Sequence, residues 1–350
     1  MLPYFIVFTI LLIASLYYQK VNESIKISIR WICINAFIIF FSFRGDIGDD
    51  YIYYFKYYNI VSISNLLLYA PGYGVLNLIF SFFNIPFHCF LVFLSIITNG
   101  MLAIFLWNKN INFPLAFLVF FALGGIVNEV DFIRNIICIL LFAYSTSYIR
   151  KQNYKKFLLL NLGGLLFHYS ALIYIPMYWL FQRSMNKAYY AKIMCICFLL
   201  SFFKLPLLDF IPICLKSIDF FCLEHIQKYF VLNENQELLF SFGTIERVLT
   251  GFAIYYYYDR FKSERYGQIL ISSYTIYFAC YEVLTKYAVL ATRFANLYVF
   301  CYWLLWPLIV DYQSTTKRRI FVTSIMCFYM ICRLIGLSSL PQWKYYTLFN

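Results

Sequence analysis

The chain has 350 residues, of which 63% are hydrophobic and only 13% are charged, and its mean hydropathy is +0.72. Soluble globular domains carry roughly 25% charged residues, so this composition excludes a water-soluble enzyme or binding domain. The net charge of +12 does not indicate a nucleic-acid-binding protein, because Lys and Arg cluster in short loops between apolar blocks. We predict an all-α polytopic membrane protein, with one integral membrane domain over residues 1–350.

Apolar blocks of bilayer length begin at the first residue. Residues 1–18 lack a basic n-region and a small-residue cleavage site, so they are predicted to be a retained span and not a signal peptide. The apolar blocks predict about ten hydrophobic segments. Counting broken or re-entrant segments separately, we expect about ten to twelve helices. Six basic loops alternate consistently when all are placed in the cytoplasm. They are residues 20–30, 109, 150–156, 183–192, 260–265 and 317–319.

This orientation assigns the remaining loops to the outer side of the membrane. The two main ones are an outer polar loop, residues 44–72, and a larger outer loop, residues 204–246. Residues 124–134, the turn near 282–293 and the tail 336–350 also fall outside. Polar chemistry is therefore expected at the outer face.

Two stretches do not fit simple crossings. Residues 72–107 contain two apolar runs that are split at 84–86, in the sequence Asn-Ile-Pro. Residues 157–181 must start and finish in the cytoplasm, yet these 25 residues are too few for two full spans at 1.5 Å per residue. Either they form a re-entrant pair of half-helices around His168, or one basic loop is assigned to the wrong side. Because irregular backbone at membrane depth must be satisfied by protein or by a water-filled cavity, a break at His168 predicts a cavity there.

The densest polar cluster follows the second span. It places Arg44 and the carboxylates of Asp46, Asp49 and Asp50 within seven residues. The tyrosine-rich run 51–58 comes next, and we interpret it either as an aromatic belt at the lipid headgroups or as a platform on which sugars stack.

Further polar residues stand at outer boundaries. Arg134 begins an apolar run and either faces the bundle interior or extends to lipid phosphates. Arg293 is a third outer arginine, while Arg247 has the pattern of an ordinary span flank. Glu282 and Lys286 have the i, i+4 spacing of a helical ion pair. His168 stands alone between apolar helices, where a histidine is commonly a hydrogen-bonded core residue.

Neither a metal site nor a cofactor is predicted. The histidines His88, His168 and His225 show no ligand spacing. Most cysteines are embedded in apolar blocks and behave as small hydrophobic residues. Cys214 and Cys222 could meet in an oxidising loop, but no disulfide framework is visible.

Three arginines at one face indicate an anionic ligand, because arginine binds phosphate in a planar, bidentate manner. A lipid-linked diphosphate would present such groups at the membrane surface. Asp50 or Asp46 could accept a proton from an attacking hydroxyl, while the arginines stabilise charge on a departing diphosphate.

The same residues resemble the EpsG-type, Wzy-like polymerases of O-antigen, capsule and exopolysaccharide. The resemblance runs in order over residues 1–300. Its matches are Arg44, Ile47-Gly48, Asp50-Tyr51 and Tyr54; Gly72-Tyr73 and Leu76-Asn77; Ile133-Arg134; the run Phe167-His168-Tyr169-Ser170-Ala171-Leu172; and Arg293 with Tyr298. The chain departs from the family pattern at Ala70-Pro71, where an acidic residue is frequent, at Asp49 for Thr, and at Asn135 for Gln.

The resemblance implies a fold like the C-type membrane glycosyltransferases, in the bacterial inner membrane. The implied activity joins repeat units carried on undecaprenyl diphosphate at the periplasmic face, with a chain-length regulator protein as a possible partner. Expected catalytic residues are Asp50, His168 and Asp46. Expected diphosphate- or glycan-binding residues are Arg44, Tyr51, Tyr54, Arg134, Tyr169, Arg293 and Tyr298. A lipid-linked oligosaccharide flippase, an O-antigen ligase and a membrane acyltransferase remain alternatives.

Overall fold

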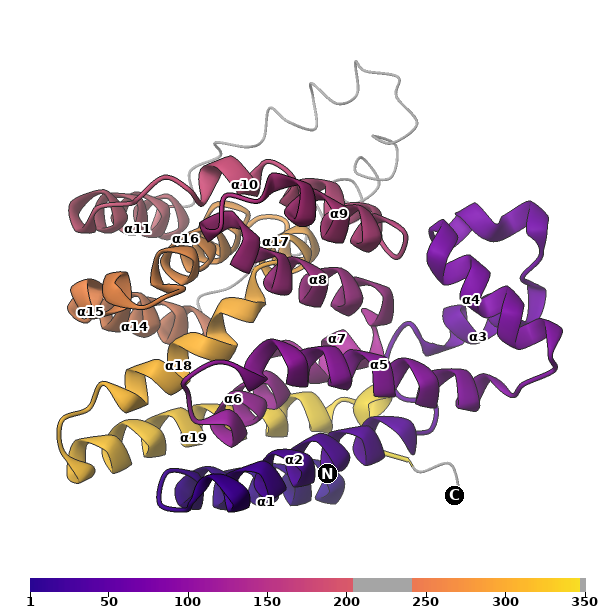
Figure 1. Ribbon diagram of the computed structural model, residues 1–350, viewed down its shortest axis with the longest axis horizontal. Helices are drawn as coiled ribbons and strands as arrows, with labels where there is room; N and C mark the ends of the chain where they lie inside the picture. Colours follow the sequence, from indigo (N-terminus) through magenta and orange to yellow (C-terminus); the bar gives the residue numbers. More distant parts are fainter. Residues whose placement is uncertain (204–240, 347–350) are drawn as a thin grey trace. The chain divides into compact units, whose positions relative to one another are not determined.

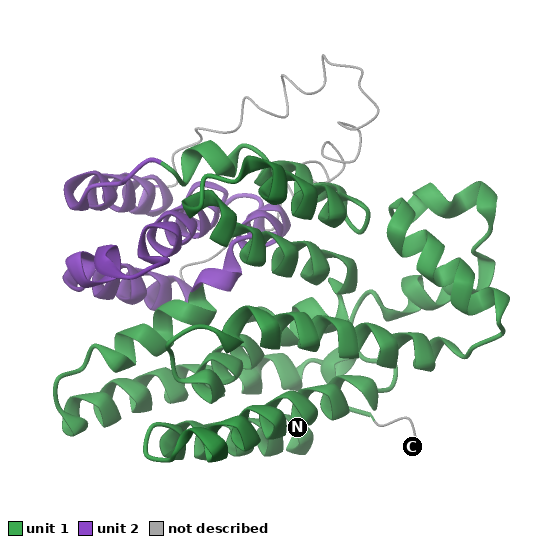
Figure 2. Ribbon diagram, in the orientation of Figure 1, with its two compact units in different colours: residues 1–182, 302–350 green, residues 183–301 purple. Residues whose placement is uncertain are grey.

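The computed structural model describes residues 1–203 and 241–346, and over these residues the protein is all-helical (Figure 1). The described chain divides into two compact units (Figure 2). The first comprises residues 1–182 and 302–350, and the second comprises residues 183–301. The all-α prediction is confirmed. The assignment of residues 1–350 to one membrane domain stays a prediction, and residues 204–240 of the larger outer loop lie outside the described residues, as do Cys214 and Cys222.

The first unit contains most of the helices. They are α1 (Leu2–Tyr18), α2 (Glu23–Ser42), α3 (Tyr51–Ile60), η1 (Ile63–Tyr69), α4 (Pro71–Phe82), α5 (Phe87–Trp107), α6 (Phe113–Phe120), η2 (Phe121–Gly125), α7 (Ile126–Val130), α8 (Ile133–Arg150), α9 (Tyr154–Leu165), η3 (Tyr169–Tyr174), α10 (Met177–Leu180), α18 (Tyr302–Asp311), α19 (Thr316–Ser339) and η5 (Pro341–Trp343). The second unit contains α11 (Lys187–Phe202), α14 (Phe242–Tyr256), α15 (Tyr258–Ser263), α16 (Gly267–Val283), α17 (Ala288–Asn296) and η4 (Val299–Cys301).

Helix α6 is the centre of the first unit. Every residue from Phe113 to Phe120 is buried, because this continuous apolar run is packed against α1, α2, α5 and α18. Asn112 caps its first turn through a hydrogen bond to the Leu115 N–H. The ring of Phe37 on α2 contacts that of Phe117 at 4.9 Å. A helix that is apolar all round must be enclosed by other helices or lipid, and here neighbouring helices enclose it.

Four described helices are long and apolar enough to cross a membrane, and a bent pair, residues 288–296 with 299–311, would be a fifth. The four are residues 23–42, 87–107, 113–130 and 316–339. Helix α1 is apolar but has only 17 residues. The larger number of predicted hydrophobic segments includes such shorter helices, because several apolar blocks are interrupted and some of their parts are shorter than a bilayer span.

Both predicted interruptions are present. Helix α4 ends at Phe82 and α5 begins at Phe87, with Asn84 in the left-handed region at φ 53° and Pro86 as the residue before α5. The chain reverses at His168, so that Tyr154 and Phe157 of α9 contact Tyr178 of α10 at ring distances of 5.0 and 5.2 Å. Helix α9 has 12 residues, a length of about 18 Å, which is too short for a bilayer core of about 30 Å. Residues 154–181 therefore form a hairpin of half-length pieces.

The loops of the first unit sort to two ends, and the side of the membrane that each end faces stays a prediction. At one end, Arg30 donates to the Tyr18 hydroxyl at 2.6 Å and lies 4.9 Å from the Trp107 ring, while Arg319 donates to Gln19 at 2.6 Å. At the other end, the Gly45 N–H donates to Tyr346 and the Gly48 N–H donates to Gln342. Basic loops predicted to be cytoplasmic thus gather opposite the polar loop that follows α2 (Figure 1).

Candidate functional site

The candidate site lies where the loop after α2 meets the end of α7. Arg44 is only 5% exposed, and its Nη1 donates to the Glu129 carbonyl at 2.7 Å. Its Nε has no hydrogen-bond partner among the described residues. Burial lowers the pKa of Arg44, and the carboxylates of Glu129 and Asp131 oppose that effect. Because a guanidinium remains charged even so, the first unit holds a buried cation at this end.

Glu129 is placed here by an interruption of the helix between α6 and α7. The backbone between α6 and α7 departs from helical geometry at Leu123 and at Gly124, where φ is 96°. Glu129 is 3% exposed, and its Oε2 accepts a hydrogen bond from Thr98 Oγ1 of α5 at 2.8 Å. Its other oxygen, Oε1, has no partner among the described residues. A buried carboxylate beside a buried arginine is costly unless the two groups serve each other or a ligand.

We expect Thr98→Val to lower the free energy of unfolding by about 1–3 kcal/mol, because the variant keeps the side-chain volume but removes a donor from a buried carboxylate. Thermal unfolding in detergent measures this. Thr323→Val, at a half-exposed position on α19, is the matched control. Equal melting temperatures for the two variants would contradict the importance of this hydrogen bond.

Asp131 connects α7 to α3. The Asp50 N–H donates to Asp131 Oδ1 at 3.2 Å, and the Tyr54 hydroxyl donates to the Asp131 carbonyl at 2.7 Å. Asp131 is 5% exposed. Burial raises the pKa of the Asp131 carboxyl to about 7, and the nearby charges of Asp50 and Asp49 also raise it. A carboxyl with such a pKa changes charge near neutral pH.

Arg134, at the start of α8, lies among tyrosine rings. Its Nη1 donates to the Tyr69 carbonyl at 2.8 Å, and its guanidinium carbon is 4.6 Å from the centre of the Tyr69 ring. The rings of Tyr54 and Tyr73 each lie 5.8 Å away. Aromatic faces stabilise a cation through their negative quadrupole. Arg134 is thereby held at the edge of the α3–α4 segment, which is the first of the two orientations considered from the sequence.

His168 is the N-cap residue of η3. Its Nδ1 accepts from the Ser170 N–H at 3.1 Å and lies 2.8 Å from Ser170 Oγ, which donates to Asn135 at 2.9 Å. Because Nδ1 accepts the backbone hydrogen bond, the proton of the neutral ring lies on Nε2. Asn135 is next to Arg134, and Gly72 donates to the Leu166 carbonyl at 2.7 Å, so the hairpin turn belongs to the same end of the unit.

Four of the predicted site residues in the first unit lie close together. Two other predicted site residues belong to the second unit. Arg44, Asp50, Tyr54 and Arg134 share direct contacts with residues 129–131 or with each other. Tyr169 donates to the Leu67 carbonyl at 3.2 Å. Arg293, which is exposed, and Tyr298, which is 2% exposed, belong to the second unit.

The tyrosine-rich run 51–58 is only partly exposed. Tyr54, Tyr57 and Tyr58 are buried, whereas Tyr53 is exposed. Tyr51 is half-buried, and its ring is stacked on that of Phe55 at a centroid distance of 6.2 Å. Burial raises the pKa of the Tyr51 hydroxyl, and the nearby charge of Asp46 also raises it. Half of the six rings in this run therefore pack against the protein, and those of Tyr51, Tyr53 and Phe55 remain the ones that a sugar could reach.

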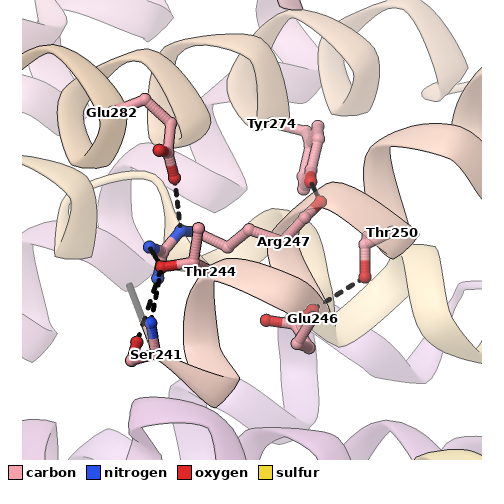
Figure 3. Close-up of polar contacts among 7 residues, drawn as sticks. All are labelled: Ser241, Thr244, Glu246, Arg247, Thr250, Tyr274 and Glu282. Carbon is pink, nitrogen blue, oxygen red and sulfur yellow. Dashed lines mark hydrogen bonds and ion pairs between the residues drawn. The ribbon is translucent and has the colours of Figure 1, made fainter. Parts of the chain in front are cut away.

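A second polar cluster lies within the second unit, around Arg247 of α14 (Figure 3). Arg247 is 8% exposed, and its Nε donates to Glu282 Oε1 at 3.1 Å. Its Nη2 donates to Thr244 at 3.1 Å, and its guanidinium carbon lies 4.2 Å from the Tyr281 ring. The interpretation of Arg247 as an ordinary span flank was wrong, because the arginine points inward. Glu282 pairs with Arg247 and not with Lys286 at i+4.

An apolar groove of about 430 Å³ lies one helical turn along α14 from Arg247. Helices α11, α14 and α16 line it, with Tyr190, Met194, Gly251, Phe252 and Phe278 among the lining residues. Its walls are almost entirely apolar, so the groove suits hydrocarbon and offers a sugar few hydrogen bonds.

Glu129, Asp131 and the Arg247–Glu282 pair have positions that sequence reasoning did not assign to a site. The sequence carries a signal for the first two, since both carboxylates stand within five residues before Arg134 and follow an apolar run. Among the described residues, no group of three His, Cys, Asp or Glu side chains is placed to hold a metal ion.

Comparison with known proteins gives one family. A family model described as the EpsG family matches residues 28–348, nearly the whole chain. No curated protein and no solved structure matches the chain.

Proposed function

Because this chain belongs to the EpsG family of Wzy-like polysaccharide polymerases, we propose that it is a membrane glycosyltransferase that extends a lipid-linked glycan. Its substrates would be oligosaccharide repeat units on undecaprenyl diphosphate. Its product would be O-antigen or a related surface polysaccharide. The reaction would take place at the periplasmic face of the inner membrane, and a chain-length regulator protein is a possible partner.

The observation that supports this most is the connection of two arginines and a carboxylate through residues 129–131. Arg44 contacts the Glu129 carbonyl, and Asp50 contacts the Asp131 carboxylate. Tyr54 links Asp131 to Arg134. Cations for a diphosphate and a carboxylate for a hydroxyl proton are the groups that this transfer needs.

In the proposed reaction, a hydroxyl oxygen of the acceptor sugar forms a bond to the anomeric carbon of the donor sugar. The bond between that carbon and the diphosphate oxygen breaks, and the lipid diphosphate leaves with the electron pair. A carboxylate accepts the hydroxyl proton, and arginines stabilise the charge that develops on the diphosphate.

Asp50 is our candidate for the base. It stands at the start of α3 and is half-buried, whereas Asp46 is exposed. His168 is the second candidate, but its Nδ1 already accepts a hydrogen bond from Ser170, so its neutral ring offers a proton at Nε2 and not a lone pair. Arg44 and Arg134 would bind diphosphate, and Arg293 of the second unit stays a proposed diphosphate-binding residue. Tyr51, Tyr54, Tyr169 and Tyr298 are the proposed glycan-binding or site-lining residues.

Complementation of a deletion strain tests the proposal, with glycan chain length as the measurement. We expect Arg44→Ala, Arg134→Ala and Arg293→Ala each to reduce long-chain product about a hundredfold, the usual effect of losing one group that stabilises transition-state charge. Single repeat units should still appear at the surface. Arg318→Ala, at an exposed position on α19, is the matched control and should give normal chains.

Full-length polymer from all three site variants would overturn the proposed mechanism. The products also separate the alternatives, because a strain that lacks a flippase exports no unit at all. A ligase defect would leave polymer on the lipid carrier.

A further inference from the structure

The N-terminus of α3 is capped in an unusual way. A helix leaves its first N–H groups without partners in the helix, and an Asp at the N-cap position commonly accepts one of them with its own side chain. Asp50 holds the N-cap position of α3 but makes no side-chain capping bond, and its backbone has φ −95° and ψ −5°. The partner of this helix end must therefore come from elsewhere.

Asp131 supplies that partner from a position 81 residues away. Its Oδ1 accepts the Asp50 N–H at 3.2 Å, and the Asp49 backbone also interacts with its carboxylate. Its carbonyl accepts the Tyr54 hydroxyl at 2.7 Å, one turn further along α3. Asp131 thus contacts α3 at two successive turns, and it is 5% exposed.

The chain makes room for this contact at Gly48. A Cβ on Gly48 would lie 2.3 Å from Asp131 Oδ1, and the φ of Gly48 is +98°. The loop before α3 therefore passes against the carboxylate so closely that only a glycine fits.

We propose that Asp131 is a positioning residue of the polymerase: from the end of α7 it holds the start of α3, and with it Asp50, in place for the proposed reaction. This inference rests on the proposed function, in which Asp50 is the base. The capping itself is a property of the fold that can be measured whether or not Asp50 is the base.

Charges around Asp131 give the cap a pH dependence. Burial, with added repulsion from Asp50 and Asp49, raises its pKa to about 7, and Arg44 and Tyr54 are the other ionisable groups that interact with it. A carboxyl whose folded-state pKa exceeds its unfolded value retains its proton in the folded state. This group's contribution to stability is therefore largest below about pH 4 and falls as the pH rises toward 7.

Hydrogen exchange of the purified full-length protein, followed by mass spectrometry of peptides from residues 46–58, tests the cap directly. We expect Asp131→Ala to speed exchange at residues 49–52 about tenfold and to abolish long-chain glycan. Asp131→Asn should keep exchange near the wild-type rate and retain polymerisation, because Asn accepts a hydrogen bond at an N-cap as well as Asp does. Its stability should no longer fall between pH 4 and 7.

Asp259→Ala is the matched control, because Asp259 is an exposed aspartate in the first turn of α15. It should leave exchange at residues 49–52 unchanged. Unchanged exchange in Asp131→Ala would overturn the proposal. So would loss of polymer in Asp131→Asn with normal exchange, because Asp131 would then act in the chemistry itself. If Asp50→Asn still polymerises, the assignment of the base fails, while the exchange data still decide whether Asp131 caps α3.

Discussion

Replacing Glu282 with alanine is expected to lower the free energy of unfolding by about 3–5 kcal/mol, the usual cost of removing one partner from a buried ion pair. Glu282 is 1% exposed, and its Oε1 lies 3.1 Å from Arg247 Nε. The variant would leave the buried guanidinium without this carboxylate, and α14 and α16 would lose one of their side-chain contacts. Loss of the folded peak in size-exclusion chromatography on heating measures the effect.

Two further variants complete the test. Glu264→Ala changes an exposed glutamate of the same unit and should be nearly neutral. The double variant Arg247→Met with Glu282→Leu should be more stable than Glu282→Ala, because apolar residues of similar volume need no charge partner. If Glu282→Ala melts at the same temperature as Glu264→Ala, the pair is not a major source of stability.

Gly48→Ala should strongly destabilise the first unit. The added Cβ would lie 2.3 Å from Asp131 Oδ1 and 2.5 Å from Val130 Cγ1, so residues 130–131 must move. The φ of +98° costs an L-residue about 1–3 kcal/mol before any clash is counted. We expect a lower melting temperature and loss of long-chain glycan together, because the loop that carries Arg44 is displaced.

Gly100→Ala is the matched control. A Cβ on Gly100 meets nothing within 4 Å, and the residue lies inside α5. Alanine there should be neutral or stabilise the helix by up to about 1 kcal/mol. Equal stability and equal glycan length for the two variants would show that the loop tolerates a side chain at position 48.

The breaks in the helices could be predicted because their causes are local. Pro86 cannot continue a preceding helix, and residues 157–181 are too few to cross twice if the basic loops on both sides are cytoplasmic. The membrane class and the polar loop at Arg44 are equally visible, because composition and charge placement are read directly from the chain.

The contacts of the site could not be predicted in the same way, because their partners are far apart in the chain. Asp131 caps a helix that begins 80 residues earlier, and Arg247 meets Glu282 on another helix. A hydropathy pattern depends only on neighbours in the sequence, and the neighbours of Arg247 are typical of the end of a membrane span. The burial of Tyr54 and Tyr57 depends on α4 folding back over α3, which the alternation of apolar and polar residues does not specify.

The hydrogen bonds of the Arg44 loop determine when, during synthesis of the chain, this loop can take its final structure. Gly45 and Gly48 donate to Tyr346 and Gln342, and the Tyr4 hydroxyl donates to the Trp343 carbonyl at 2.8 Å. The ribosome makes these partners roughly 300 residues after the loop, a delay of roughly 15–60 s at 5–20 residues per second. During that interval the arginine loop has left the ribosome without its final supports. Chains that stop early would enter the membrane with an unfinished loop, so only chains synthesised past residue 346 would become competent to act.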